Sequence, residues 1–225
     1  MNLLTPSFSI LQAEESDIPV LAELLTHSHG SEAIMAFIFP DWPRTDTILP
    51  YMTFRLQAKF AEPNSTFYKA VDDASGTILG MVCLTLETGE QVLDRKLTSA
   101  GGGFEPPPGF NWAFAGEVVQ GLAKLDKYMV GKRHYMVSSL AVHPKHHKRG
   151  LGTKLMEHCH AIVDKEGLPI YLTAFPGAHH LYLKWGYEDV DYFEVDLNEH
   201  GRKYRGFGIY RSWAMIRKPG KELAN

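Results

Sequence analysis

The 225-residue chain is poor in cysteine and has no long apolar run. Its two cysteines, Cys83 and Cys159, each lie in an apolar stretch and cannot form a disulfide framework or a four-thiolate metal site. No run of apolar residues approaches the roughly 18 that would suggest a membrane span. The first ten residues, MNLLTPSFSI, lack the basic segment that begins a signal peptide. We therefore expect a cytoplasmic protein with no membrane partner.

The chain also lacks an excess of positive charge. It carries 23 Lys and Arg against 26 Asp and Glu, a formal net charge of −3. Domains that bind nucleic acid usually carry a strongly basic face, so we expect no nucleic-acid partner. Several histidines cluster between residues 143 and 180, but they show neither HExxH nor two-histidine-one-carboxylate spacing. We therefore expect no metal site.

The composition is that of an ordinary globular protein. Apolar residues make up 44% of the chain and charged residues 22%. Periodicity predicts strands over 7–12, 67–71, 77–86, 135–142, 170–174, 187–195 and 208–216. It predicts helices over IPVLAELL with Ser16 as the cap, and over 47–60, 117–130, 151–163 and 176–185. Strands that alternate with helices indicate a mixed α/β arrangement, which we expect to form a single domain over residues 1–225.

Residues 88–132 interrupt this alternation. They contain Gly101–Gly103, then Pro106–Gly109, and four aromatic residues at 104, 110, 112 and 114. Such a glycine- and proline-rich tract cannot continue a strand or a helix. Insertions of this length often form lids or binding loops. A surface excursion with no such role is the alternative.

The stretch LAVHPKHHKRGLGTKLM, residues 140–156, carries a chemical signal. A strand ends before Pro144, and Gly150 and Gly152 stand at the start of an amphipathic helix. A helix N-terminus offers unpaired N–H groups and partial positive charge, which suit a phosphate, and glycine lets the backbone approach it. Neither GxxxxGK[ST] nor GxGxxG is present, which excludes a Walker loop and a dinucleotide fingerprint. A turn that merely starts a helix remains open.

Two motifs together resemble the GNAT acyltransferase superfamily. The segment from His147 to Gly152, HKRGLG, is similar to that family's pyrophosphate loop [Q/R]-x-x-G-x-[G/A], with histidine at the first position. This departure is mild, because backbone makes most of that contact. Residues 178–188, AHHLYLKWGYE, resemble the family's second segment, in which a tyrosine precedes a Gly-[Phe/Tyr] pair. The resemblance covers residues 66–188 apart from the insertion.

The resemblance implies an α/β (α+β) fold. It would have a splayed mixed sheet of about six to seven strands, about four flanking helices and one long insertion. Acetyl-CoA would enter the gap between the strands 135–142 and 170–174. The residues expected to hold it are Leu140, Ala141 and Val142 beside the pantetheine arm, and His147, Lys148, Arg149, Gly150, Leu151, Gly152 and Thr153 around the pyrophosphate.

The resemblance also implies a catalytic acid. Tyr182 matches the tyrosine that protonates the departing CoA thiolate, and a neutral phenol can deliver that proton. A core aromatic is the alternative reading. The base is less clear, because the strand 135–142 contains no carboxylate and Met136 or a neighbour occupies the region of the histone-type glutamate. Glu87 is our candidate, with Glu117, His134 or a chain of water molecules as alternatives.

These features predict an enzyme that transfers an acetyl group from acetyl-CoA to a primary amine of a small molecule. The amine would attack the bound thioester directly in a ternary complex. Residues 88–132 would then form a lid on the acceptor side. A non-catalytic acyl-CoA-binding or sensing domain and a protein-lysine acetyltransferase are the alternatives. The chain could act as a monomer or a homodimer.

Overall fold

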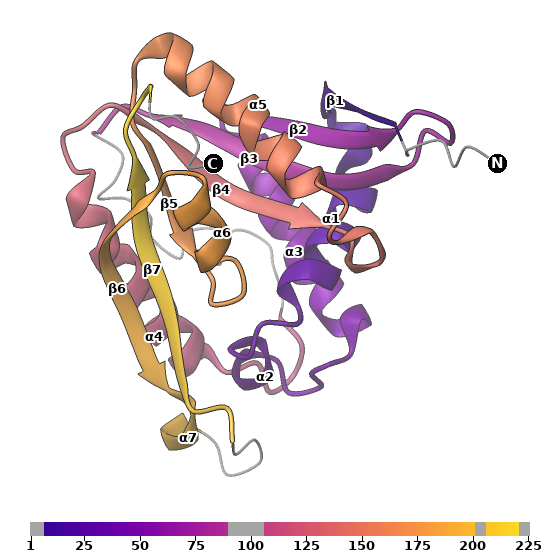
Figure 1. Cartoon of the computed structure of the whole chain (residues 1–225). Coiled ribbons are helices and arrows are strands. Elements are labelled where there is room, and N and C mark those ends of the chain that lie inside the picture. Colours follow the sequence, from indigo (N-terminus) through magenta and orange to yellow (C-terminus); the bar gives the residue numbers. More distant parts are fainter. Residues whose placement is uncertain (1–6, 90–105, 201–205, 221–225) are drawn as a thin grey trace.

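The computed structural model describes residues 7–89, 106–200 and 206–220, and these contain one seven-stranded sheet (Figure 1). The strand order is β1-β2-β3-β4-β5-β7-β6. The strands are β1 (Phe8–Gln12), β2 (Ser65–Asp72), β3 (Ile78–Glu87), β4 (His134–Val142), β5 (Ile170–Ala174), β6 (Glu188–Asp196) and β7 (Ile209–Arg217). Only β4 and β5 are parallel, and the other neighbours are antiparallel. The expected mixed, splayed sheet is therefore confirmed.

Helices cover both faces of the sheet. The long ones are α1 (Ile18–His29), α3 (Thr45–Phe60), α4 (Trp112–Leu125) and α5 (Leu151–Glu166). The short ones are α2 (Met35–Ile38), α6 (His179–Lys184) and α7 (Leu197–His200). Apolar residues of α5 and α6 share one core cluster with the sheet, and residues of α1 to α4 share another. Figure 1 shows α5 in front of the sheet with α1 and α3 behind it.

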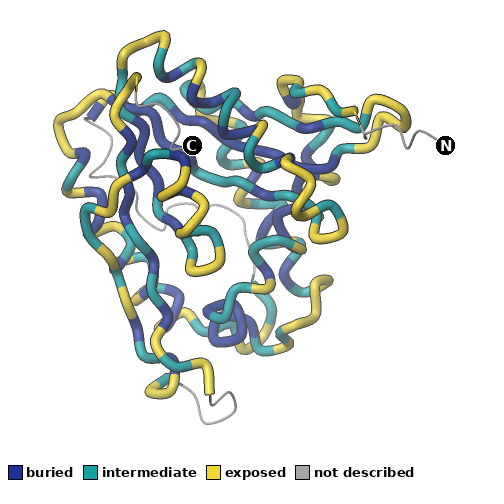
Figure 2. The backbone as a smooth tube through the Cα atoms, viewed as in Figure 1, coloured by how far each residue is buried: buried dark blue, intermediate teal, exposed yellow. Residues whose placement is uncertain are grey.

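The alternation of side chains along β3 explains these two layers. Met81 and Cys83 point into the cluster under α1 and α3, whereas Val82 and Leu84 point into the cluster under α5. A strand covered on both faces reads as a continuous apolar run, as ILGMVCLTL does. Both cysteines are buried and free. In Figure 2 the central strands β3 and β5 are mostly buried, whereas the edge strands β1 and β6 carry mainly intermediate and exposed residues.

The predicted strands match the observed ones to within two residues at either end, but two helix predictions were wrong in detail. Ser16 does not cap α1, because it lies in a 3-10 turn over Glu15–Asp17 in which the Asp17 carboxylate accepts from the Glu14 N–H at 2.8 Å. The helix predicted over 117–130 begins at Trp112 and ends at Leu125. Its cap is Asn111, whose Oδ1 accepts from the Phe114 N–H at 3.1 Å. None of the helices in the described ranges is long and apolar enough to span a bilayer.

Candidate active site

The parallel strands β4 and β5 separate soon after they meet. Their register contains only two pairs, Tyr135 with Ile170 and Met136 with Tyr171. Beyond Met136, β4 stays paired with β3 as far as Val142. The edge of β4 that faces β5 therefore has no strand partner over its C-terminal half. The sheet is open at this point, as Figure 1 shows between β4 and β5.

The hydrogen-bond pattern decides which β4 groups face the gap. The His143 N–H donates to the Leu79 carbonyl of β3 at 2.9 Å. In an antiparallel pair, alternate residues direct their backbone N–H and C=O groups toward the partner strand and away from it. The backbone groups of Ala141 therefore also face β3, and those of Leu140 and Val142 face β5. Two of the three predicted residues thus present backbone N–H and C=O groups to the gap. Ala141 does not, and its side chain is buried in the core.

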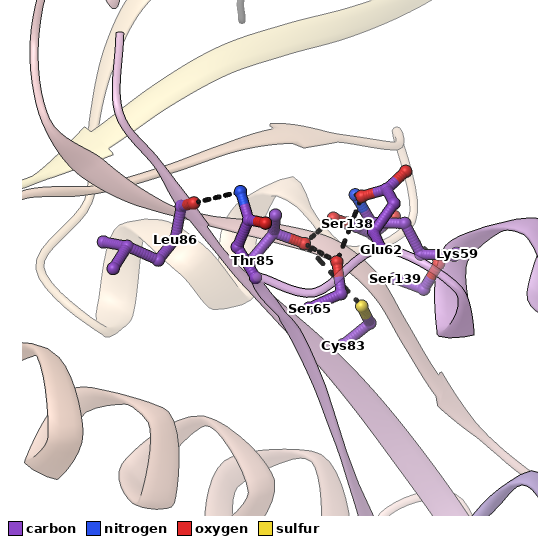
Figure 3. A network of polar contacts seen from close by, with 9 residues as sticks. Lys59, Glu62, Ser65, Cys83, Thr85, Leu86, Ser138 and Ser139 are labelled. Carbon is purple, nitrogen blue, oxygen red and sulfur yellow. Dashed lines mark hydrogen bonds and ion pairs between the residues drawn. The ribbon is translucent and has the colours of Figure 1, made fainter.

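A β-bulge lies where β4 begins to diverge. Cys83 pairs with Ser139 and Leu84 pairs with Val137, so Ser138 is the extra residue. Its hydroxyl lies 3.0 Å from that of Thr85, and the Thr85 hydroxyl lies 2.9 Å from that of Ser65 (Figure 3). Ser65 in turn donates to the Glu62 carboxylate at 3.1 Å, beside Lys59. This chain of hydroxyls ties the bulge to the neighbouring strands and fixes where the gap opens.

The predicted pyrophosphate loop follows the open end of β4. Lys148 and Gly150 have left-handed backbone conformations, with φ of 60° and 79°, and α5 begins directly after Gly150. A Cβ at Gly150 would meet no atom within 4 Å, and one at Gly152 would lie 3.9 Å from Val142 Cγ2. No side chain therefore covers the backbone at Gly150, where α5 begins beside the gap. Such an end, with a glycine that lets the backbone approach a ligand, suits an anion such as a phosphate.

The loop's side chains divide into exposed and buried ones. His147, Lys148 and Arg149 are exposed, and Thr153 is half-buried. The His147 ring bonds through Nε2 to the Val142 carbonyl at 2.8 Å, which connects the loop to the gap-facing edge of β4. Leu151 is buried in the core, so only its backbone can meet a ligand. The structure thus gathers every predicted loop residue at the mouth of the gap.

Tyr182 lies on α6, in the core beneath α5. Its side chain is 6% exposed, and its ring makes edge contacts with Trp185 and Tyr187 at centroid distances of 5.4 and 5.5 Å. Burial raises the pKa of the Tyr182 phenol above its ordinary value, and the nearby Cys159 raises it further. The hydroxyl therefore stays protonated at neutral pH. The protonated phenol is the form that can donate a proton, and the raised pKa makes it a weaker acid than an ordinary phenol.

The structure does not bring the candidate bases to the gap. Glu87 is buried at the end of β3 and pairs in register with His134, at the closed end of β4. Leu140 lies six positions after His134, which is about 20 Å along a strand. His134 Nδ1 bonds the Lys132 carbonyl at 2.8 Å. Glu117 lies on α4, 3.7 Å from the His200 ring, beside a groove of about 670 Å³ between α4 and β6.

Sequence reasoning missed His29, the last residue of α1. Its ring hydrogen-bonds the Leu140 carbonyl and packs edge-on against Phe175 with centroids 5.1 Å apart. The residue is 111 positions from Leu140 in sequence, so no spacing motif could have paired them. A polar residue at the end of an otherwise apolar helix face was the only local signal. No three His, Cys, Asp or Glu side chains in the described part of the chain are grouped to hold a metal ion.

The described part of the insertion is anchored by aromatic contacts. Phe110 packs against Phe39 with centroids 5.2 Å apart, and Phe114 packs against Phe37 at 5.6 Å. Both partners belong to the segment around α2, which follows His29 in the chain. This described part of the insertion therefore lies on the α1 side of the sheet, opposite α5.

Comparisons with known proteins agree with this architecture. The sequence model of the Acetyltransferase (GNAT) family matches residues 92–187. Among solved structures, arylalkylamine N-acetyltransferase 2 from Aedes aegypti has a TM-score of 0.68 at 11% identity, over 94% of this chain and 99% of that chain. A mutant of agmatine N-acetyltransferase has a TM-score of 0.63 at 15% identity, over 94% and 99%. Among curated proteins, no sequence matches significantly.

A third solved structure contains coenzyme A. It is PaiA N-acetyltransferase from Thermoplasma acidophilum in complex with coenzyme A, with a TM-score of 0.55 at 14% identity, over 94% of this chain and 99% of that chain. At these identities the likeness of the structures establishes the fold, and the family assignment rests on the match to the family model. The segment from residue 92 to residue 187, which contains β4, the loop after it and Tyr182, matches the Acetyltransferase (GNAT) family.

Proposed function

We propose that the protein transfers the acetyl group of acetyl-CoA to a primary amine of a small, partly apolar molecule. The observation that carries this proposal is the gap between β4 and β5. Leu140 and Val142 turn their backbone groups into it, and the bare N-terminus of α5 stands at its mouth. An extended pantetheine arm needs unpaired backbone groups along its length, and the pyrophosphate at its end needs an anion site such as the α5 N-terminus.

On the donor side, the predicted residues have distinct roles. The backbone N–H groups of Leu140 and Val142 bind the pantetheine arm and the thioester as an added strand would bind. The loop from His147 to Thr153 holds the pyrophosphate through backbone N–H groups, with Lys148 and Arg149 adding positive charge. Ala141 contributes by keeping β4 bonded to β3.

On the acceptor side, residues 88–132 cover the substrate as part of a single domain. The aromatic contacts of Phe110 and Phe114 with Phe39 and Phe37 support this role, because they fix the described part of the insertion on the face opposite α5. An apolar surface rich in aromatic rings suits an amine with an apolar body better than a charged peptide. The likeness to agmatine and arylalkylamine acetyltransferases concerns the fold and is compatible with such an acceptor.

The chemistry is a direct transfer between two bound substrates. The neutral amine attacks the thioester carbon, a C–N bond forms, and the carbonyl oxygen becomes an oxyanion. An N–H group at the gap, such as that of Leu140, can stabilise this charge. The C–S bond then breaks, and the thiolate takes the phenolic proton of Tyr182. Tyr182 recovers its proton from solvent. Holding both reactants in one gap supplies much of the rate.

The test is a turnover assay that measures release of free CoA across acceptor classes. The panel contains arylalkylamines, polyamines, amino acids, aminoglycosides and lysine peptides, with acetyl-CoA saturating. We expect the highest kcat/KM with a small amine that carries an apolar group. Tight acetyl-CoA binding with no turnover of any acceptor would support a sensing domain instead. A clear preference for peptides would support a protein-lysine acetyltransferase.

A further inference from the structure

His29 contacts residues on both sides of the gap between β4 and β5. It ends α1, and its ring bonds the carbonyl of Leu140 on β4. The same ring packs against Phe175, the residue that directly follows β5. One imidazole thus contacts β4 and the residue that follows β5. Leu140 is also one of the two residues whose N–H faces the gap, so the ring lies beside a group that would polarise the thioester carbonyl.

The hydrogen bond to Leu140 fixes the tautomer of the ring. A carbonyl only accepts, so one ring nitrogen must carry the proton that is donated to it. In the neutral ring the other nitrogen then holds a lone pair. His29 is half-buried, so part of the residue remains accessible from outside the core. The ring is therefore an oriented proton acceptor at the gap.

The surroundings keep this ring neutral. Burial lowers the pKa of His29 to about 4, and the positive charge of Arg55 on α3 contributes to the shift. The hydrogen bond to the Leu140 carbonyl acts in the opposite direction but does not outweigh them. At neutral pH the ring is consequently uncharged and able to accept a proton.

We propose that His29 accepts the proton that the acceptor nitrogen loses when it is acetylated. The proposal rests on the function proposed above and adds the missing base. When the C–N bond forms, the nitrogen becomes cationic and far more acidic than a free ammonium group. The N–H bond then breaks, the proton passes to the free ring nitrogen of His29, and the imidazolium releases it to water. The nitrogen keeps its electron pair as the amide forms.

Two variants separate a base from a packing residue. His29→Gln keeps an N–H donor for the Leu140 carbonyl but has no basic nitrogen, whereas His29→Ala removes the ring. His158→Gln is the matched control. His158 is also half-buried with a pKa lowered by burial, but it lies on α5 against Tyr68. Each variant is assayed for kcat, for both KM values and for calorimetric affinity toward acetyl-CoA.

We expect His29→Gln to lower kcat by roughly 10²-fold or more, the usual scale for a lost proton acceptor. Its acetyl-CoA affinity should remain within about twofold of wild type, and His158→Gln should match wild type throughout. Added imidazole should restore part of the activity of His29→Ala. A His29→Gln variant with wild-type kcat would overturn the assignment while the acetyltransferase activity stands. A wild-type protein that turns over no amine would overturn both.

Discussion

The two ends of α5 share one backbone feature, a glycine in the left-handed conformation, but have different surroundings. A left-handed glycine stands at each end, Gly150 with φ of 79° and Gly167 with φ of 66°, and neither has an atom within 4 Å of where a Cβ would be. At the C-terminal end, the Asp164 carboxylate accepts from Arg217 at 2.8 and 2.9 Å and from the Gly220 N–H at 2.9 Å. At the N-terminal end, the neighbours are exposed cationic residues and the gap.

This contrast shows that glycine conformation alone does not mark a ligand site. Arg217 is 3% exposed and Asp164 is half-buried, so the C-terminal end of α5 is fixed to β7 by an ion pair whose guanidinium is buried. The N-terminal end instead faces the unpaired edge of β4. We infer that one end carries stability and the other carries the donor substrate. Changes at the two ends should therefore separate folding from binding.

The largest expected effect concerns Tyr182, which lies in the core beneath the middle of α5 yet is assigned to the reaction. Tyr182→Phe should preserve the fold and the affinity for acetyl-CoA but lower kcat by roughly 10²–10⁴-fold, since the thiolate would lose its proton donor. Steady-state kinetics under conditions where chemistry limits the rate provide the measurement. Wild-type kcat in the variant would leave Tyr182 as a packing residue.

The pH dependence sharpens this prediction. Because the pKa of Tyr182 is raised, the protonated, proton-donating form persists as pH rises through 10. Wild-type kcat should therefore show no fall below about pH 10 that is due to this phenol. An alkaline fall centred below that pH and absent from Tyr182→Phe would contradict the assignment.

At the C-terminal end of α5, Asp164→Ala should cost about 3 kcal/mol of unfolding free energy, because it takes the carboxylate from a buried guanidinium. Denaturant unfolding would measure this loss. Acetyl-CoA affinity of the folded variant should be unchanged. A weakened affinity would show that the two ends of α5 are coupled rather than separate.

The matched pair Gly150→Glu and Gly167→Glu compares the ends directly. Each substitution places a non-glycine residue at positive φ, at a similar cost of about 1–2 kcal/mol in stability. Only Gly150→Glu also places a negative charge where the pyrophosphate should lie. We expect it to weaken acetyl-CoA binding at least about tenfold, or 1.4 kcal/mol, by calorimetry. Equal affinities in the two variants would remove the loop assignment.

The smallest expected effect is an acid sensitivity at the C-terminal end. Hydrogen bonds from Arg217 lower the pKa of Asp164 below its ordinary value. The carboxylate's contribution to stability is then complete above its unfolded pKa of about 3.9 and is lost as pH falls through the lower, folded value. Wild type should lose more stability than Asp164→Ala between about pH 4 and 2. Parallel losses would show that the pair contributes little.

Local pattern was sufficient for most of the fold. Strands such as Ile170–Ala174 were predicted from short apolar runs between turn residues, and the motif around Gly150 identified the loop. The start of α4 was missed because Asn111 caps it through its side chain, while Pro106–Gly109 just before it reads as loop. The ends of a helix depend on single capping hydrogen bonds of this kind, and the spacing of apolar residues does not reveal them.

Only the part of the candidate site whose residues are adjacent along the chain could be predicted from the sequence. The loop and β4 are neighbours along the chain, so His147 to Thr153 and Leu140 could be assigned together. His29 meets Leu140 only after the sheet and α1 have packed, and Glu87 is separated from the gap by the direction in which β3 pairs with β4. Glu87, a candidate base chosen by residue type, therefore lies at the end of β3 that is far from the gap.

The central claim is that the donor substrate binds the outward-facing edge of β4, and amide hydrogen exchange tests it most directly. Leu140 and Val142 turn their N–H groups into the gap, whereas Ala141 and Ser139 turn theirs toward β3. With acetyl-CoA bound, residue-resolved exchange should slow at Leu140 and Val142 and stay unchanged at Ala141 and Ser139. Exchange that is unaffected at all four amides, or slowed only at Ala141 and Ser139, would contradict the account.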